Sequence, residues 1–286
     1  DISYTINTGA ARKQLVMTDG TLLTPTRVPF AGTNGRLVDD ADLTFVTDTL
    51  TSTKIKTTTP LGYAEMYMYE NATACVIDDS LNTYHAVYNT FGNNDGTEAP
   101  EIDTTYFTYK AGVGYAIASV ANYNSPTNTQ IICTVTAGHA LLAGEPITIS
   151  GSTDYNGTYL VLAAGLSGTE FVVTKTYTQT RTGSARRPAT LKALVTGKYN
   201  LSFNISGACE SANDIFKFEL NKDITSLDNI VCNVLWTSGT NYRSAAGSGL
   251  SSLTAGQYVW MSVKNNSTGH GDLTIRNANV NIRRLI

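Results

Sequence analysis

The chain has 286 residues, of which 15% are charged, and its formal net charge at pH 7 is −3. A protein of this length buries enough apolar surface to need no disulfide or metal in its core. Average globular proteins contain about 25% charged residues, so the predicted surface is polar but mostly uncharged. These values exclude a strongly basic protein of the kind that binds nucleic acid or an anionic membrane surface.

The composition and its patterning favour an all-β protein. Glycine and tyrosine are abundant, at 24 and 16 residues, and Thr, Ser and Asn are frequent; this mixture is typical of strands joined by tight turns. No helical period extends beyond two turns, so we expect no coiled coil. No apolar run is long enough for a membrane-spanning helix, so we expect no membrane insertion.

Residues 1–60 are rich in threonine and are interrupted by glycine and proline. Short alternating patterns predict strands at 43–46 and 52–56. So short a strand pair is poorly stable alone. We therefore expect an ordered segment that attaches the chain to a neighbour or oligomerises it, with a flexible linker as the alternative.

Residues 124–188 are predicted to form an insertion within a larger β domain. Turn-rich stretches at 124–128 and 182–188 enclose strand patterns at 130–135, 146–149, 158–162 and 170–175. The Asn156-Gly157 pair is a strong hairpin signal, because both central residues of that turn need positive φ. Closely spaced hairpins indicate a small sheet or barrel-like unit.

The flanking regions carry the longest alternating patterns. Predicted strands before the insertion lie at 63–69, 83–88, 105–109 and 115–120, and after it at 198–206, 216–220, 257–263, 272–275 and 280–286. Gly247-Ser248-Gly249 is predicted to be a loop, and it lacks the lysine of a phosphate-binding loop.

The four cysteines are widely spaced and form no close pair of zinc ligands. They are Cys75, Cys133, Cys209 and Cys232. Each lies in or near an apolar strand pattern, so we expect buried free thiols. A bridge between Cys209 and Cys232 stays open as an alternative.

No catalytic constellation is predicted. The three histidines, His85, His139 and His270, fall in different units, and His139 is expected to stabilise a turn. Adjacent carboxylates, at 39–40 and 78–79, point to opposite faces of a strand and make a poor catalytic pair. The arginine pairs at 186–187 and 283–284 are expected to form subunit salt bridges or to aid solubility. We therefore expect no enzyme, no metal and no cofactor.

Three motifs resemble the TNF/C1q-like jelly-roll family. Gly197-Lys198-Tyr199 is similar to the Gly-x-Tyr that opens a long inner strand, Gly256-Gln257-Tyr258-Val259 to a later strand entry, and Val280–Leu285 to the closing strand. The resemblance implies an all-β jelly-roll sandwich whose first part is 61–123 and whose second part is 189–286. It also implies a homotrimer.

Two other segments resemble parts of tailed-bacteriophage virion proteins. One is Pro29–Asp40, with its Gly-x-Leu-x-x-Asp pattern, and the other is the inserted stretch with Gly138-His139 and Tyr155-Asn156-Gly157-Thr158-Tyr159. This resemblance implies a trimeric fibre or capsid decoration protein at the virion surface, attached to another virion protein through residues 1–60. Its expected role is host-surface adhesion or particle stabilisation. The alternatives are a secreted C1q-like lectin or adhesin and, third, a polysaccharide-degrading tailspike.

Tyrosines cluster in the first part of the expected jelly roll. The candidates for a glycan-contact or trimer-face surface are Tyr63, Tyr67, Tyr69, Tyr84 and Tyr88. The first three share a parity and so lie on one face of a regular strand. If exposed beside Asn and Thr, they would offer aromatic plates and amide groups to a host-surface glycan; otherwise they belong to the core or to the subunit contact.

Overall fold

A computed structural model describes residues 27–31, 37–46, 49–52, 62–68, 75–77, 85–86, 101–209, 213–236, 242–267 and 272–285. Within these ranges the chain forms strands β1 to β20, and none of the described residues belongs to a helix that could cross a membrane. The chain divides into two compact units, Asp1–Pro60 and Leu61–Ile286.

The first unit contains a three-stranded antiparallel sheet of β1 (Arg27–Ala31), β2 (Leu37–Val46) and β3 (Thr49–Ser52). β1 and β2 pair with Phe30 opposite Val38, and Leu37 to Asp40 of the Gly-x-Leu-x-x-Asp pattern lie in β2. The expected strand at 43–46 lies within β2. Of the expected strand at 52–56 only Ser52, the last residue of β3, is described; residues 53–56 lie outside the described residues.

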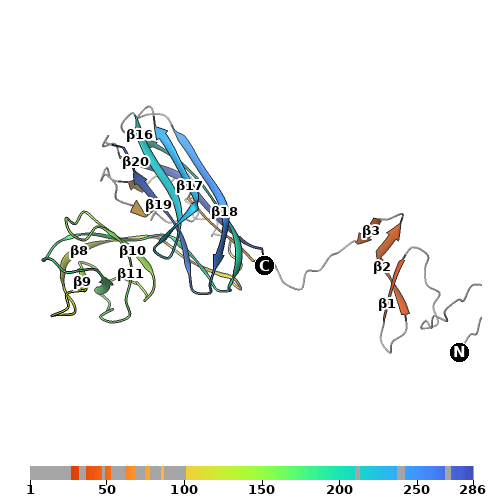
Figure 1. The fold of residues 1–286 in the computed structure, drawn as a ribbon, viewed down its shortest axis with the longest axis horizontal. Coiled ribbons are helices and arrows are strands. Elements are labelled where there is room, and N and C mark those ends of the chain that lie inside the picture. Colours follow the sequence, from red (N-terminus) through yellow and green to blue (C-terminus); the bar gives the residue numbers. More distant parts are fainter. Residues whose placement is uncertain are drawn as a thin grey trace, which may run out of the picture. The chain divides into compact units, whose positions relative to one another are not determined.

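The second unit is built on two facing sheets (Figure 1). The first sheet has the order β18-β15-β20-β4 and the second β17-β16-β19-β14-β7. Their bounds are β4 (Tyr63–Met68), β7 (Phe107–Lys110), β14 (Thr190–Ala193), β15 (Gly197–Cys209), β16 (Asp214–Lys222), β17 (Thr225–Trp236), β18 (Arg243–Leu253), β19 (Tyr258–Asn265) and β20 (Leu273–Arg284). Two short strands, β5 (Cys75–Ile77) and β6 (His85–Ala86), pair with β20 and β19.

The strand order is that of a jelly roll. If β4 and β14 to β20 are numbered one to eight along the chain, the sheets have the orders 1-8-3-6 and 2-7-4-5, with β7 added beside strand two. Every neighbouring pair is antiparallel. This double Greek key confirms the expected all-β jelly-roll sandwich.

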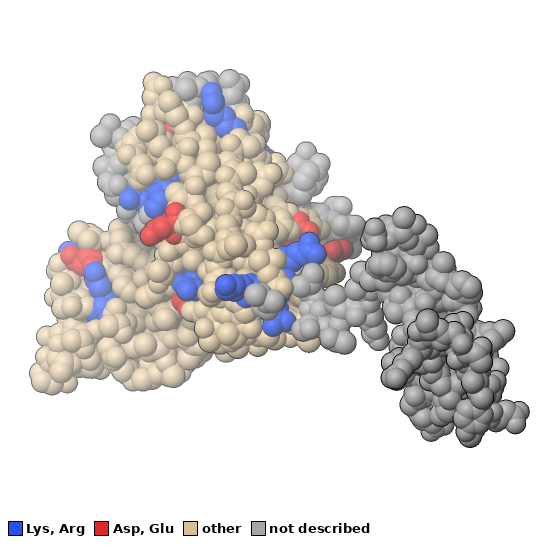
Figure 2. All heavy atoms as spheres, turned by 45° about the vertical axis from the view of Figure 1, so that its right-hand side comes forward, with Lys and Arg blue, Asp and Glu red and all other residues tan. Residues whose placement is uncertain are grey.

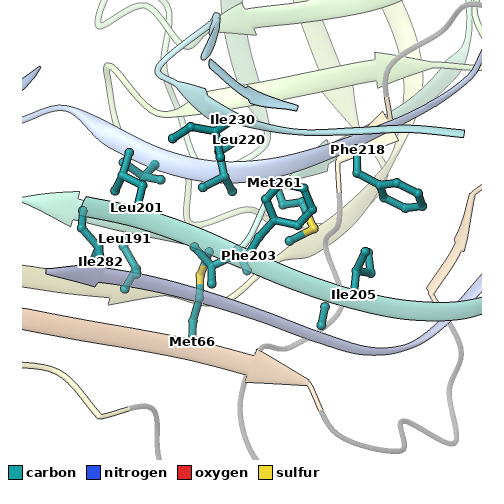
Figure 3. Close-up of a cluster of buried hydrophobic side chains, with 14 of the residues drawn as sticks. Met66, Leu191, Leu201, Phe203, Ile205, Phe218, Leu220, Ile230, Met261 and Ile282 are labelled. Atoms are coloured by element: carbon teal, nitrogen blue, oxygen red, sulfur yellow. The ribbon is translucent and has the colours of Figure 1, made fainter. Parts of the chain in front are cut away.

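Alternating side chains of both sheets form the core between them. On β15, Tyr199, Leu201, Phe203 and Ile205 are buried while the residues between them face outward. Figure 3 shows Phe203 and Ile205 among side chains of the opposite sheet, including Met261. Each such side chain contributes roughly 1.5–3 kcal/mol when fully buried.

The predicted loop at 247–249 is wrong, because these residues lie in the middle of β18. They pair with β15 in an unbroken register. A Cβ atom on Gly247 would lie 2.5 Å from Cε1 of Phe203, and one on Gly249 would lie 2.8 Å from Cγ1 of Ile230. Close packing against the core therefore explains the glycines, and no turn is involved.

A third sheet, of six strands, interrupts the jelly roll between β7 and β14. Its order is β11-β10-β13-β8-β9-β12, formed by β8 (Val113–Asn122), β9 (Gln130–Val135), β10 (Pro146–Ser150), β11 (Gly157–Leu160), β12 (Glu170–Thr174) and β13 (Gly183–Arg187). A bridge between Leu162 and Val172 joins its two edges, so the sheet closes on itself as a small barrel. We call β8 to β13 the inserted barrel.

The inserted barrel has a hydrophobic core of its own, which includes Ile131, Ile149 and Phe171. Ile117 and Val120 of β8 belong to this core, whereas the sequence patterns placed β8 in the first part of the jelly roll. β13 occupies the stretch that was predicted to be turn-rich. It is a strand because Ala185 packs into the same core while β8 and β10 pair on either side.

Cys133, Cys209 and Cys232 are free thiols. The first two are buried, as expected, and Cys232 packs half-buried against the jelly-roll core. The alternative bridge between Cys209 and Cys232 is therefore not formed.

Candidate functional site

The outward surface of the β18-β15-β20-β4 sheet carries short polar side chains at successive positions across four strands. We call this surface the polar face. One row across it comprises Glu65, Asn281, Ser202 and Ser248, and the next comprises Tyr67, Asn279, Asn204 and Ala246. These residues point away from the core because they alternate with its buried members.

Charged side chains are sparse in the sequence, at 15% of all residues. Figure 2 shows one side of the molecule, on which the coloured Lys, Arg, Asp and Glu atoms are few and scattered among uncharged residues. The two rows of the polar face defined above contain one ionisable acid, Glu65. A surface of this kind offers hydrogen bonds without a strong field.

The polar face contains a hollow, and all four strands of the sheet contribute residues to its lining. The hollow has a volume of about 470 Å³. β4 contributes Glu65 and Tyr67 to its lining, and β18 contributes Ser244. The other polar side chains come from β15 and β20: Asn204, Ser206, Asn277 and Asn279.

A β-bulge shapes this hollow. The register between β15 and β20 shifts between Ser206, which is opposite Asn277, and Gly207, which is opposite Ile275. Bulges bend a strand and re-aim its side chains. The two strands approach closely here, since a Cβ atom on Gly207 would lie 2.5 Å from the carbonyl oxygen of Thr274. The absence of a side chain at 207 therefore permits the bulge that presents Asn277 to the hollow.

Hydrogen bonds hold several lining groups in place. Nδ2 of Asn277 donates to Oγ of Ser206 at 3.0 Å. Nδ2 of Asn279 donates to the Glu65 carboxylate, and Nδ2 of Asn281 donates to Oδ1 of Asn279. Asn204 and Ser244 are exposed. The site is therefore partly pre-organised, with exposed polar groups at its centre.

The structure places two of the five candidate tyrosines. Tyr63, at 49% exposure, and the half-buried Tyr67 lie on the outward face of β4, and Tyr67 lines the hollow. Tyr69, Tyr84 and Tyr88 lie outside the described residues.

The other candidate side chains have structural roles. Nδ1 of His139 accepts a hydrogen bond from the Leu141 amide at 3.2 Å, and its ring packs edge-on against Tyr115 and Phe171 with centroids 6.0 Å apart. His139 thus stabilises a turn, as predicted. Of His85 only the backbone is described, and His270 lies outside the described residues. Among the side chains that the structure describes, no group of three His, Cys, Asp or Glu could hold a metal ion.

The prediction of a surface role for both arginines at 186–187 is wrong for Arg187, which is 5% exposed. Its Nη2 donates to the Ala111 carbonyl at 2.8 Å and its Nη1 to the Ala140 carbonyl at 3.2 Å. The buried Glu145 lies beside it and also pairs with Lys110. Sequence patterns missed this pairing, because the three charged residues are brought together only by the entry and exit of the inserted barrel.

Sequence reasoning also missed the hollow itself. The alternation on β15 was recognised, but the second polar series, Asn277, Asn279 and Asn281, was not matched to it. The sequence did contain a signal for this series, since asparagine occupies every second position from 277 to 281. The bulge that aligns the two series depends on strand pairing and has no local signature.

No protein-family model matches the chain, and no curated protein matches its sequence. Among solved structures, the chain is similar to Eiger TNF from S. frugiperda, with 15% identity, a TM-score of 0.28, and coverage of 60% of this chain and 94% of that one. It is also similar to a VP2 protein of infectious bursal disease virus, with 10% identity, a TM-score of 0.20, and coverage of 79% and 73%. Likenesses this weak carry no argument about function, and the fold assignment rests on the strand order above.

Proposed function

We propose that this chain is a structural protein of a tailed-bacteriophage particle, a homotrimeric fibre or capsid decoration protein at the virion surface. The observation that carries the proposal is the division into two units, a small one with a three-stranded sheet and a large jelly roll with an inserted barrel. A sheet as small as β1–β3 gains stability by packing against something larger. The first unit would attach the chain to another virion protein, and the second would be displayed.

The displayed unit would act by adhesion to the host surface or by stabilising the particle, and not by catalysis. The polar face supports adhesion because two adjacent rows across it combine hydrogen-bonding side chains with a single carboxylate, Glu65. Three copies on one particle would multiply a weak contact through avidity. This role needs neither a metal nor a cofactor.

A secreted C1q-like lectin or adhesin is the second candidate function. The hollow in the polar face favours it, because a lectin and an adhesive fibre would use the same kind of polar site. A polysaccharide-degrading tailspike is not supported by the hollow, since a glycosidase uses a pair of carboxylates and Glu65 is the single acid among the lining residues.

The experiment is light scattering on the purified full chain, followed by binding of the labelled protein to host cells. The proposal predicts a mass near three times 30.6 kDa. It also predicts that a monomeric form of the protein binds cells much more weakly than the trimer does. A monomer at micromolar concentration would contradict the trimer. A trimer in the culture medium of cells that carry no phage would favour the secreted lectin.

A further inference from the structure

We propose that the hollow in the polar face binds a neutral carbohydrate, a hexose or N-acetylhexosamine unit of a surface glycan. This inference deepens the proposed adhesive function and rests on it. Its volume, about 470 Å³, lies within the range of pockets that take small ligands, about 300–1,000 Å³.

The lining matches the chemistry of a sugar. Sugar hydroxyls donate and accept hydrogen bonds, and so do the amide of Asn204 and the hydroxyl of Ser244. Tyr67 adds an aromatic ring to the lining, and the electron-rich face of such a ring suits the C–H groups of a pyranose ring. Glu65 is the one acidic group in the lining, and it already accepts the Asn279 amide. The site therefore favours a neutral ligand over an acidic one.

The site is built on strands and not on loops. The hydrogen bond from Asn277 to Ser206, at 3.0 Å, and the bond from Asn279 to Glu65 fix amide orientations before any ligand arrives. Binding then requires little ordering of side chains, which limits its entropic cost.

A subunit contact is the competing use of the same surface. The buried centre of a protein interface is enriched in aromatic residues and depleted in serine and glutamate. The lining of the hollow instead includes Ser206, Ser244, Glu65 and one tyrosine, and its Asn204 is exposed. These features favour a glycan over a second copy of the chain.

The test uses the full chain on an array of neutral and acidic oligosaccharides, with two matched variants. Asn204→Trp fills the hollow with an indole ring. Asn200→Trp places the same ring on the same strand and face, about 13 Å away at strand spacing and outside the lining. Both positions are exposed, so neither variant should disturb the core, and circular dichroism checks their folding.

We expect wild type to bind neutral oligosaccharides, Asn204→Trp to weaken this binding at least tenfold, and Asn200→Trp to leave it within about twofold. Asn204→Ala, which removes the amide without adding bulk, should weaken it several-fold. The proposal would be overturned if wild type bound acidic glycans alone or no glycan. It would also be overturned if both tryptophan variants bound neutral oligosaccharides equally. A loss of trimer mass confined to Asn204→Trp would overturn it too, because that loss would identify the hollow as a subunit contact. None of these glycan results decides whether the chain is a virion trimer, which is measured separately.

Discussion

The carboxylate of Glu145 faces the guanidinium of Arg187 inside the protein, with Oε2 and Nη1 3.9 Å apart. The two residues are 1% and 5% exposed. Arg187 ends β13, where the chain leaves the inserted barrel, and it also donates to the carbonyl of Ala111, just before the chain enters β8. The pair thus ties the entry and exit of the inserted barrel together.

Replacing Glu145 by glutamine should loosen this junction. The amide keeps the shape of the side chain but leaves the buried charge of Arg187 without its counter-ion. Breaking one partner of a buried pair costs about 3–5 kcal/mol. Amide hydrogens in peptides from residues 113–187 should therefore exchange faster, because the free energy of opening is lower by this amount. Glu170→Gln, at a half-buried edge position of β12, is the control and should change exchange little; equal effects of both variants would refute the role of the pair.

The hydroxyl of the buried Tyr155 organises the loop before β13. It donates to the carbonyl of Gln179 at 2.5 Å and accepts from the amides of Thr178 and Gln179 at 3.0 and 2.9 Å. Tyr155→Phe should lower the free energy of unfolding of the inserted barrel by about 1–3 kcal/mol, because it leaves buried polar groups unsatisfied. Tyr123→Phe, at an exposed tyrosine, should be near neutral in the same denaturant titration.

Replacing glycine by alanine should affect stability differently in β18 and in β8. A Cβ atom at Gly247 would lie 2.5 Å from the Phe203 ring, whereas one at Gly114 in β8 meets nothing within 4 Å. We expect Gly247→Ala to destabilise the jelly roll by about 1–3 kcal/mol through overpacking. Gly114→Ala should be neutral or slightly stabilising. Tryptophan fluorescence during thermal unfolding reports on the jelly roll, and hydrogen exchange on the inserted barrel; a harmless Gly247→Ala would count against close packing in β18.

Because Cys133 is buried, the free energy of unfolding should depend on pH in the alkaline range. Burial raises the pKa of its thiol to about 12, against about 8.5 in an unfolded chain. Below pH 8.5 both states keep the proton, so the thiol contributes no pH dependence. Above it the unfolded state loses the proton first, and the free energy of unfolding falls as pH rises. This fall continues toward pH 12.

The measurement is the free energy of unfolding from pH 8.5 to 9, a window about one unit or more below the ordinary tyrosine pKa of about 10. Cys133→Ala should be less stable at every pH because of the cavity it leaves, but its decline with pH should be shallower than that of wild type. Parallel declines would show that Cys133 titrates normally in the folded protein.

Much of the jelly roll could be predicted, because its long strands alternate in the sequence as they do in the sheet. The Gly197-Lys198-Tyr199 motif does open β15, and Tyr199 is fully buried with an edge-on contact to Phe107 at 5.7 Å. Strand alternation sets the buried face locally, so pattern and structure agree there.

The errors arose where tertiary contacts override local preference. β18 was missed because glycine and serine favour loops on their own, while its pairing with β15 and the Phe203 ring require small residues. One residue of the candidate site was predictable: Tyr67 lines the hollow, and it shares an outward face of β4 with Tyr63, as their parity indicated. The hollow was not, because it depends on a bulge and on Asn204 and Asn279 meeting across strands far apart in the sequence.

The most direct test of the central claim is immunogold electron microscopy of intact particles of the phage proposed to carry the chain, with antibodies raised against residues 61–286. The account predicts regular labelling on the outside of intact particles, in proportion to trimers, and recovery of the protein from purified virions by mass spectrometry. Purified particles that lack the protein, or label only after disruption, would contradict the claim that it is displayed on the virion surface.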